Sequence, residues 1–187
     1  MIYILMGLLA FLLFAAYDIN SITSKKNIVN SFFFVGSFLL IAATAGIIIE
    51  SFHDIKWDLG WMSIFGIFTL IFLILLIYTL FFALPFNETY LKCNPTPKVY
   101  RDGFYALCRH PGVLWFMGFY FFLWLTLKIP LLLLAGIIFS CCNLMYVIFQ
   151  DNWTFTRVFE DYNDYKKHTP FIIPNFKSIK RCLQTLQ

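Results

Sequence analysis

The sequence predicts an all-α, polytopic membrane protein of a single domain that covers residues 1–187. Its composition is 60% hydrophobic and only 13% charged, whereas soluble domains carry about 25% charged residues. The apolar residues, 24 Phe among them, fall in long uninterrupted runs. A run of about 20 apolar residues is the length that crosses a bilayer as a helix. We therefore expect about five transmembrane helices.

The predicted helices follow five apolar runs, which cover residues 2–17, 28–49, 59–84, 113–127 and 130–149. The first run ends before Asp18 and lacks the basic flank of a signal peptide. The second ends before Glu50 and the third before Pro85. Only Lys128 and Ile129 separate the last two runs, so these runs predict a tight C-terminal helical hairpin.

The basic residues predict the orientation of the chain. Twelve of the 14 Lys and Arg residues fall on one predicted side: Lys25, Lys26, Lys92, Lys98, Arg101, Arg109, Arg157, Lys166, Lys167, Lys177, Lys180 and Arg181. The other side receives Lys56 and Lys128. Because cytoplasmic loops are enriched in Lys and Arg, we expect the N-terminus outside and the C-terminus in the cytoplasm, in the cell membrane. The net charge of +4 then points to anionic lipids as partners rather than to nucleic acid.

A short polar turn, Gly103–Pro111, is the first candidate site. It presents Arg109 and His110 at the edge of the bilayer, where ionisable residues tend to mark function. Pro111 suits the first position of a helix, so both side chains are expected at a helix N-terminus, which favours an anion. The preceding polar loop, residues 85–108, is expected to be either a plain connector or a wall or lid of the site.

The second candidate region follows the hairpin. Apolar positions recur at helical spacing through residues 154–167, namely at Phe155, Val158, Phe159, Tyr162 and Tyr165. This stripe predicts one amphipathic helix lying at the cytoplasmic membrane surface. Pro170 and Pro174 then break the helix and leave an extended apolar segment.

Taken together, these two regions resemble the isoprenylcysteine carboxyl methyltransferase family of integral-membrane enzymes and its bacterial relatives. The resemblance covers about residues 100–175. It depends on Gly103-x-Tyr105-x-x-x-Arg109-His110-Pro111, the hairpin, an acidic residue at Asp151, Tyr162-x-x-Tyr165 and Pro170-x-x-x-Pro174. The family has an acidic pair where this chain has Gln150 and Asp151. The resemblance implies S-adenosylmethionine as cofactor and a lipophilic methyl acceptor that enters from the bilayer: a prenylcysteine carboxylate, a lipid amine or a thiol.

The resemblance also implies the site residues. Cofactor binding is expected from Tyr105, Arg109, His110, Pro111, Asp151, Tyr162 and Tyr165. Arg109 suits the cofactor carboxylate through a charge-assisted contact. Asp151 accepts from the cofactor ammonium or a ribose hydroxyl, or else is an ordinary charge ending a span. The three tyrosines wall the adenosine or form an interfacial belt.

His110 and Asp151 are the candidate catalytic residues. An amine or thiol acceptor must lose a proton, and either side chain is a candidate base. His110 alternatively orients the acceptor or caps the helix. Two other functions stay open: an NADPH-dependent membrane reductase of the sterol-reductase type, and an inactive membrane scaffold of the same fold. The five cysteines show no metal-ligand spacing, so no metal is expected.

Overall fold

The computed structural model describes residues 1–23, 26–82 and 98–185, and within these ranges all the regular secondary structure is helical, without a strand. The long helices are α1 (Ile2–Ile22), α3 (Phe32–Glu50), α4 (Leu59–Phe81), α6 (Pro111–Leu127) and α7 (Pro130–Phe149). Four of them are long and apolar enough to cross a membrane, and α6 is a shorter apolar helix of 17 residues. The prediction of an all-helical, polytopic membrane protein is therefore confirmed.

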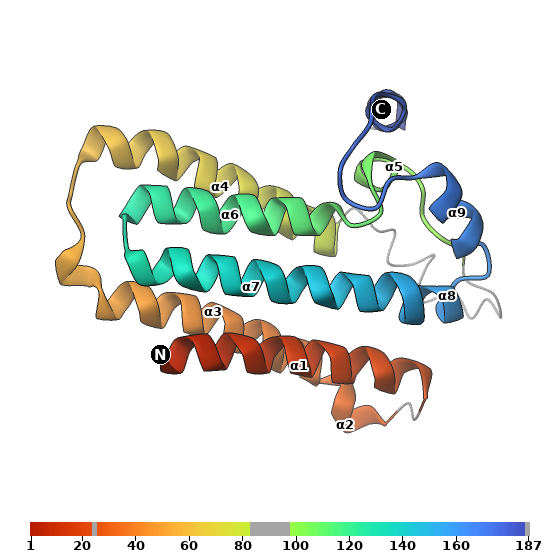
Figure 1. The fold of residues 1–187 in the computed structure, drawn as a ribbon, viewed down its shortest axis with the longest axis horizontal. Coiled ribbons are helices and arrows are strands. Elements are labelled where there is room, and N and C mark those ends of the chain that lie inside the picture. The colour runs from red at the N-terminus through yellow and green to blue at the C-terminus, as the bar shows by residue number, and fades with distance from the viewer. Residues whose placement is uncertain (24–25, 83–97, 186–187) are drawn as a thin grey trace.

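The long helices lie side by side, with α7 between the α4–α6 pair and the α1–α3 pair (Figure 1). The short elements are α2 (Asn27–Asn30), η1 (Phe52–Asp54), α5 (Phe104–Leu107), the π-helical turn η3 (Gln150–Thr154), α8 (Phe155–Val158), α9 (Tyr162–His168) and α10 (Phe176–Thr185). Of these, α5, α8, α9 and α10 gather at one end of the bundle (Figure 1). The connections at residues 51–58 and 128–129 lie at the opposite end.

Local sequence explains where several helices begin and end. The Asp58 side chain caps α4 by accepting a hydrogen bond from the Trp61 backbone N–H at 3.1 Å. Both α6 and α7 begin with proline, whose missing N–H costs nothing at the first helical position. Lys128 ends α6 in the left-handed region, with φ 55°, and its Nζ lies 3.9 Å from the centre of the Trp61 ring.

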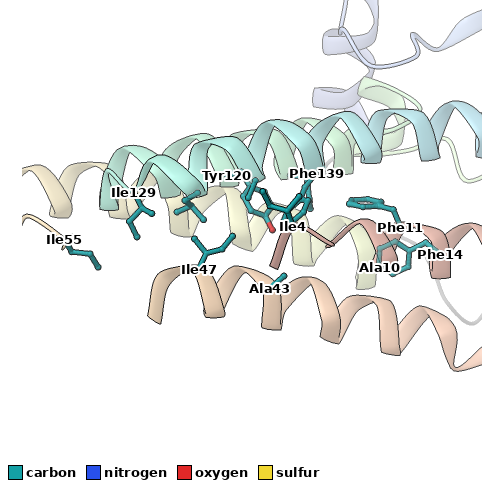
Figure 2. Close-up of a cluster of buried hydrophobic side chains, with 13 residues drawn as sticks. Ile4, Ala10, Phe11, Phe14, Ala43, Ile47, Ile55, Tyr120, Ile129 and Phe139 are labelled. Atoms are coloured by element: carbon teal, nitrogen blue, oxygen red, sulfur yellow. The ribbon is translucent and has the colours of Figure 1, made fainter. Parts of the chain in front are cut away.

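The helices are joined by an aromatic and small-residue core (Figure 2). Ala43 on α3 is fully buried, and a Cβ at Gly46 would stand 2.2 Å from the Tyr3 ring, so α1 and α3 approach closely there. Between α3 and α6, the Thr44 and Tyr120 hydroxyls are 2.6 Å apart. Such a hydrogen bond fixes the relative position of two helices where no water is present to compete.

Apolar side chains also cover the outer surface of the bundle. On α4 the exposed residues include Ile64, Ile67, Leu70, Ile71 and Ile74, each more than two-fifths accessible. A soluble monomer rarely exposes so continuous an apolar face. Lipid is the environment that such a surface requires.

Two predictions of helix extent were wrong. The first span was expected to stop before Asp18, but α1 continues to Ile22 and leaves that carboxyl 6% exposed. The helix continues because Asp18 finds a partner on another element, as described below. The second predicted run divides at Ser31 into α2 and α3. The fourth helix begins at Pro111, the residue that the sequence indicated as its first position.

The amphipathic helix predicted for residues 154–167 was also wrong as a single element. The chain forms η3 and α8, turns extended at Phe159, and resumes a helix only at Tyr162. At this break the Asp161 side chain accepts from Arg101 and from the Val99 backbone N–H. The end of the third predicted span and most of the loop expected as a connector or lid lie outside the described residues.

Candidate functional site

The Arg-His-Pro turn is held in place by the segment near the second pair of prolines. The Arg109 backbone N–H donates to the Pro170 carbonyl at 2.9 Å, and the His110 N–H donates to the Phe171 carbonyl at 3.2 Å. Pro111 is fully buried as the first residue of α6. Two motifs about 60 residues apart in sequence therefore form one backbone unit at the end of the bundle.

Gly103 determines the backbone conformation at the start of α5, the short helix that precedes the Arg-His-Pro turn. Its φ is 58° and its ψ is −131°, a combination that L-residues with a side chain rarely adopt. Its N–H donates to the Thr185 hydroxyl at 2.9 Å, which ties the start of α5 to α10. The glycine of the sequence motif thus has a backbone role.

Asp151 is the centre of the side-chain cluster. Its Oδ1 accepts from the Tyr162 hydroxyl at 2.7 Å and lies 3.1 Å from His110 Nε2. Its Oδ2 lies 2.8 Å from Lys166 Nζ. Arg109 approaches the same carboxylate, with Nε 3.0 Å from Oδ1 and Nη2 3.4 Å from Oδ2. Four side chains, two from the turn before α6 and two from α9, thus converge on one carboxylate that is 3% exposed.

Arg109 is paired with Asp151 in charge but is not fully hydrogen-bonded. Although Nε lies near Oδ1, its N–H is not directed at that oxygen and has no acceptor. Nη1 donates to the Lys166 carbonyl at 3.1 Å, and the guanidinium lies 5.4 Å from the centre of the Phe171 ring. A buried guanidinium N–H without an acceptor is unusual and costs stability. It leaves one donor for a further acceptor.

The π-helical turn explains how Asp151 reaches the cluster. At the end of α7 the Phe155 N–H donates to the Gln150 carbonyl, five residues back, so the turn holds one more residue than an α-helical turn. Such bulges are rare and occur frequently at functional sites. Asp151 and Thr154 are both 3% exposed within this turn.

The cluster carries more positive than negative charge. Arg109 and Lys166 contribute two cations, and Asp151 contributes one anion. Burial lowers the pKa of His110, and Arg109 and Lys166 act in the same direction, while Asp151 opposes them. His110 is therefore neutral near pH 7, and because an ionised carboxylate can only accept, its Nε2–H donates to Asp151. The ring lies between Phe155 and Phe171, 5.8 and 5.1 Å away.

The three tyrosines make protein contacts. The Tyr165 hydroxyl donates to the Tyr105 carbonyl at 2.6 Å, and the Tyr105 hydroxyl donates to the Thr79 carbonyl at 3.2 Å. Tyr162 and Tyr165 are each 2% exposed, and burial raises the pKa of both phenols well above the usual range. Their hydroxyls connect α9 to α5 and to Asp151, so they position the cluster.

Sequence reasoning missed two participants. Lys166 was taken as part of a polar helix face, although its position four residues after Tyr162 puts the two on one side of α9. Asp18 was taken as the end of a span. Its Oδ2 accepts a hydrogen bond at 2.8 Å from Nε2 of Gln150, the residue that precedes Asp151 in the sequence. No local signal in the first 20 residues indicates that contact.

Two further observations concern this end of the molecule. Among the residues that the structure describes, no group of three His, Cys, Asp or Glu side chains is placed to hold a metal ion. A cleft of about 480 Å³ lies between α9 and α10, and its lining shares no residue with the Asp151 cluster.

Comparison with known proteins found no match: no family model, no curated protein and no solved structure corresponds to the chain.

Proposed function

We propose that the chain is an integral-membrane methyltransferase that uses S-adenosylmethionine to methylate a lipophilic acceptor. The observation that carries the proposal is that Arg109 and His110 both contact Asp151. The turn with Arg109 and His110 and the segment with Pro170 are the parts that resemble the isoprenylcysteine carboxyl methyltransferases, and they meet through two backbone hydrogen bonds beside Asp151.

The residues present fit the charged end of this cofactor. The cluster has one cation in excess, and the Arg109 Nε–H has no acceptor. A bound carboxylate would balance the excess charge and accept a hydrogen bond from this N–H. A planar guanidinium suits a carboxylate better than a point charge does. Asp151 is the group that would accept from the cofactor ammonium. When bound, the cofactor would supply a methyl group already activated by a sulfonium.

The protein's own residues would then position the cofactor and the acceptor and exclude water from them. For some acceptors they would also remove a proton. A carboxylate acceptor attacks without a base. An amine or thiol acceptor must lose a proton, and His110 suits that role because burial keeps it neutral near pH 7, the form that can take up a proton. Such an acceptor would reach the cluster from the bilayer, while the cofactor would arrive from the water beyond the ends of the spans.

We also propose the orientation on which this depends. The Asp151 cluster, α9 and α10 lie at the end of the bundle where most basic residues fall, and that end is expected in the cytoplasm. The cell membrane is the expected location.

One observation favours a second function, an inactive scaffold of the same fold. Asp151 is already contacted by four side chains of the chain itself and is 3% exposed. A site completed in this way holds the end of the bundle together without any ligand. Binding and turnover separate the two functions.

The test uses detergent-purified protein and S-adenosylhomocysteine. We expect this ligand to raise the thermal unfolding temperature, because a ligand that binds the folded state adds stability by mass action, and NADPH to have no effect. Arg109→Lys should weaken binding by roughly tenfold or more, since losing a charge-assisted hydrogen bond costs about 1.5–3 kcal/mol. The matched control is Arg157→Lys, an exposed arginine over Trp153.

Three outcomes distinguish the functions. Stabilisation by NADPH alone would favour the reductase. Cofactor binding without methyl transfer to prenylcysteine, lipid amine or thiol acceptors would favour the scaffold. Equal binding by wild type and Arg109→Lys would remove Arg109 from the proposed site.

A further inference from the structure

Helix α10 has features that the proposed methyl transfer does not use. It is a well-formed helix: Asn175 Oδ1 caps it by accepting from the Ser178 N–H at 2.9 Å, and the Ser178 hydroxyl accepts from the Asn175 N–H at 3.0 Å. Ser178 and Cys182 are buried where α10 packs on α5. One face of α10 is therefore fixed to the protein.

The second face of α10 is apolar and exposed. Phe176, Ile179 and Leu183 recur at helical spacing and are 94%, 41% and 65% exposed. Ile173, just before the helix, is 82% exposed. Phe176 and Leu183 are large side chains on a helix outside the spans, and water is an unfavourable environment for them.

The third face of α10 is basic. Lys177, Lys180 and Arg181 lie on it, and the helix contains no Asp or Glu. Together with Lys167 of α9 they line the cleft of about 480 Å³, where Arg181 Nη2 donates to the His168 carbonyl at the end of α9. The cleft thus gathers four cations next to the exposed apolar stripe.

The direction of α10 matches a membrane surface. Figure 1 shows α10 end-on, beside the end of the bundle, whereas the spans run across the picture. A helix that lies crosswise to the spans lies along the plane of the bilayer. A helix with one apolar and one basic face in that position is built to lie in the interface.

From these observations we infer that α10 docks on an anionic lipid surface. Phe176, Ile179 and Leu183 enter the acyl boundary, and the cleft between α9 and α10 takes the phosphate of an anionic headgroup. The occupant is lipid rather than another protein because the basic face and the apolar stripe adjoin on a helix held parallel to the membrane. The inference does not depend on methyl transfer.

The experiment is hydrogen–deuterium exchange of the full chain in nanodiscs. One set contains phosphatidylcholine alone and the other also contains phosphatidylglycerol. We expect the amides of residues 176–185 to exchange more slowly with the anionic lipid, while those of α4 stay unchanged. Two basic residues beside an anionic surface strengthen attachment by roughly thirtyfold, so the slowing of exchange that depends on Lys177 and Lys180 should not exceed about thirtyfold.

Matched variants identify the residues responsible. Lys177→Gln/Lys180→Gln should abolish the lipid-dependent protection. Lys56→Gln/Lys128→Asn removes the same charge at the opposite end and should preserve it, with Asn tolerating the left-handed backbone at position 128. Leu183→Gln should speed exchange of α10 in both lipids.

Three results would overturn the inference. They are equal exchange of α10 in the two lipids, equal loss of protection in both double variants, and protection in phosphatidylcholine nanodiscs on adding inorganic phosphate. The last would assign the cleft to a free anion instead of a headgroup.

Discussion

Asp18 Oδ2 accepts a hydrogen bond from Gln150 Nε2 at 2.8 Å, across 132 positions of sequence, and this contact joins α1 to the turn that carries Asp151. Gln150 Nε2 also donates to the Tyr146 hydroxyl at 2.9 Å. An acidic residue inside a membrane-spanning helix is expensive to bury and usually has a purpose. Here it fixes the first helix of the bundle against the π-helical turn.

Replacing Asp18 should therefore loosen the candidate site as well as the bundle. Asp18→Leu leaves the half-buried Gln150 amide without this acceptor and should lower the free energy of unfolding by about 1–3 kcal/mol. Asp18→Asn retains a carbonyl acceptor and should lose less. Unfolding in mixed micelles measures both. Equal stability of wild type and Asp18→Leu would show that the contact contributes nothing.

Two buried tyrosines offer a matched comparison of hydrogen bonds. Tyr162→Phe removes a donor to the Asp151 carboxylate and should cost about 1.5–3 kcal/mol, the range for bonds to charged groups. Tyr165→Phe removes a donor to a neutral carbonyl and should cost about 0.5–1.5 kcal/mol. Thermal unfolding ranks the two variants. The reverse order would mean that Tyr162 does not stabilise the charge of Asp151.

The pKa of His110 predicts a loss of stability in acid. Burial lowers this pKa below the ordinary 6.5, so the unfolded chain takes up a proton before the folded chain does. The stability that depends on neutral His110 is complete above about pH 6.5 and falls as the pH drops below it. His110→Gln should flatten that part of the pH profile. His168→Asn, at an exposed histidine, should retain it, and an unchanged slope in His110→Gln would contradict the assignment.

Arg109 and Asp151 should be strongly coupled. Arg109→Ala breaks a buried pair and should cost up to about 3–5 kcal/mol, since a buried charge loses a partner. The double variant with Asp151→Asn should cost less than the sum of the single variants, with a coupling of about 0.5–3 kcal/mol. The control cycle is Arg101 with Asp164, an exposed pair whose coupling should be smaller. If the effects of the Arg109 and Asp151 substitutions on the free energy of unfolding are additive, the two side chains do not stabilise each other.

The proposed orientation can be tested by labelling introduced cysteines. Cys182 is a poor reporter because it is 5% exposed, on the face of α10 that packs on α5. In a Cys93→Ser background, Gln184→Cys should resist an impermeant thiol reagent applied to intact cells. Lys56→Cys, at the opposite end of the bundle, should be labelled. The opposite pattern would invert the topology.

The sequence predicted the parts of the molecule that depend on local chemistry. Long apolar runs determine the helices, since backbone groups in lipid must be satisfied within each segment. Pro111 and Pro130 indicated two helix starts. Boundaries failed where a distant partner decides the outcome, as at Asp18, whose compensation comes from Gln150.

The same division holds for the candidate site. Arg109, His110 and Asp151 were predicted as site residues, and the structure brings them together, although their function stays a prediction. Lys166 was missed because its role depends on the π-helical turn, which has no periodic signature. Tyr165 was expected to face a ligand or the membrane interface. Its hydroxyl donates to the Tyr105 carbonyl, a contact that depends on where the folded chain places α5 and that the sequence does not indicate.

The backbone pairing of Arg109 with Pro170 has a consequence for biosynthesis. Translation delivers Arg109 and His110 first, then the hairpin and Asp151, and only afterwards Lys166 and Pro170. Until the last of these is made, Asp151 lacks the Lys166 cation, and the turn before α6 lacks the Pro170 segment to which it is hydrogen-bonded in the folded chain. A chain that ends after α8 would therefore contain every long helix of the bundle but not the residues that complete the cluster.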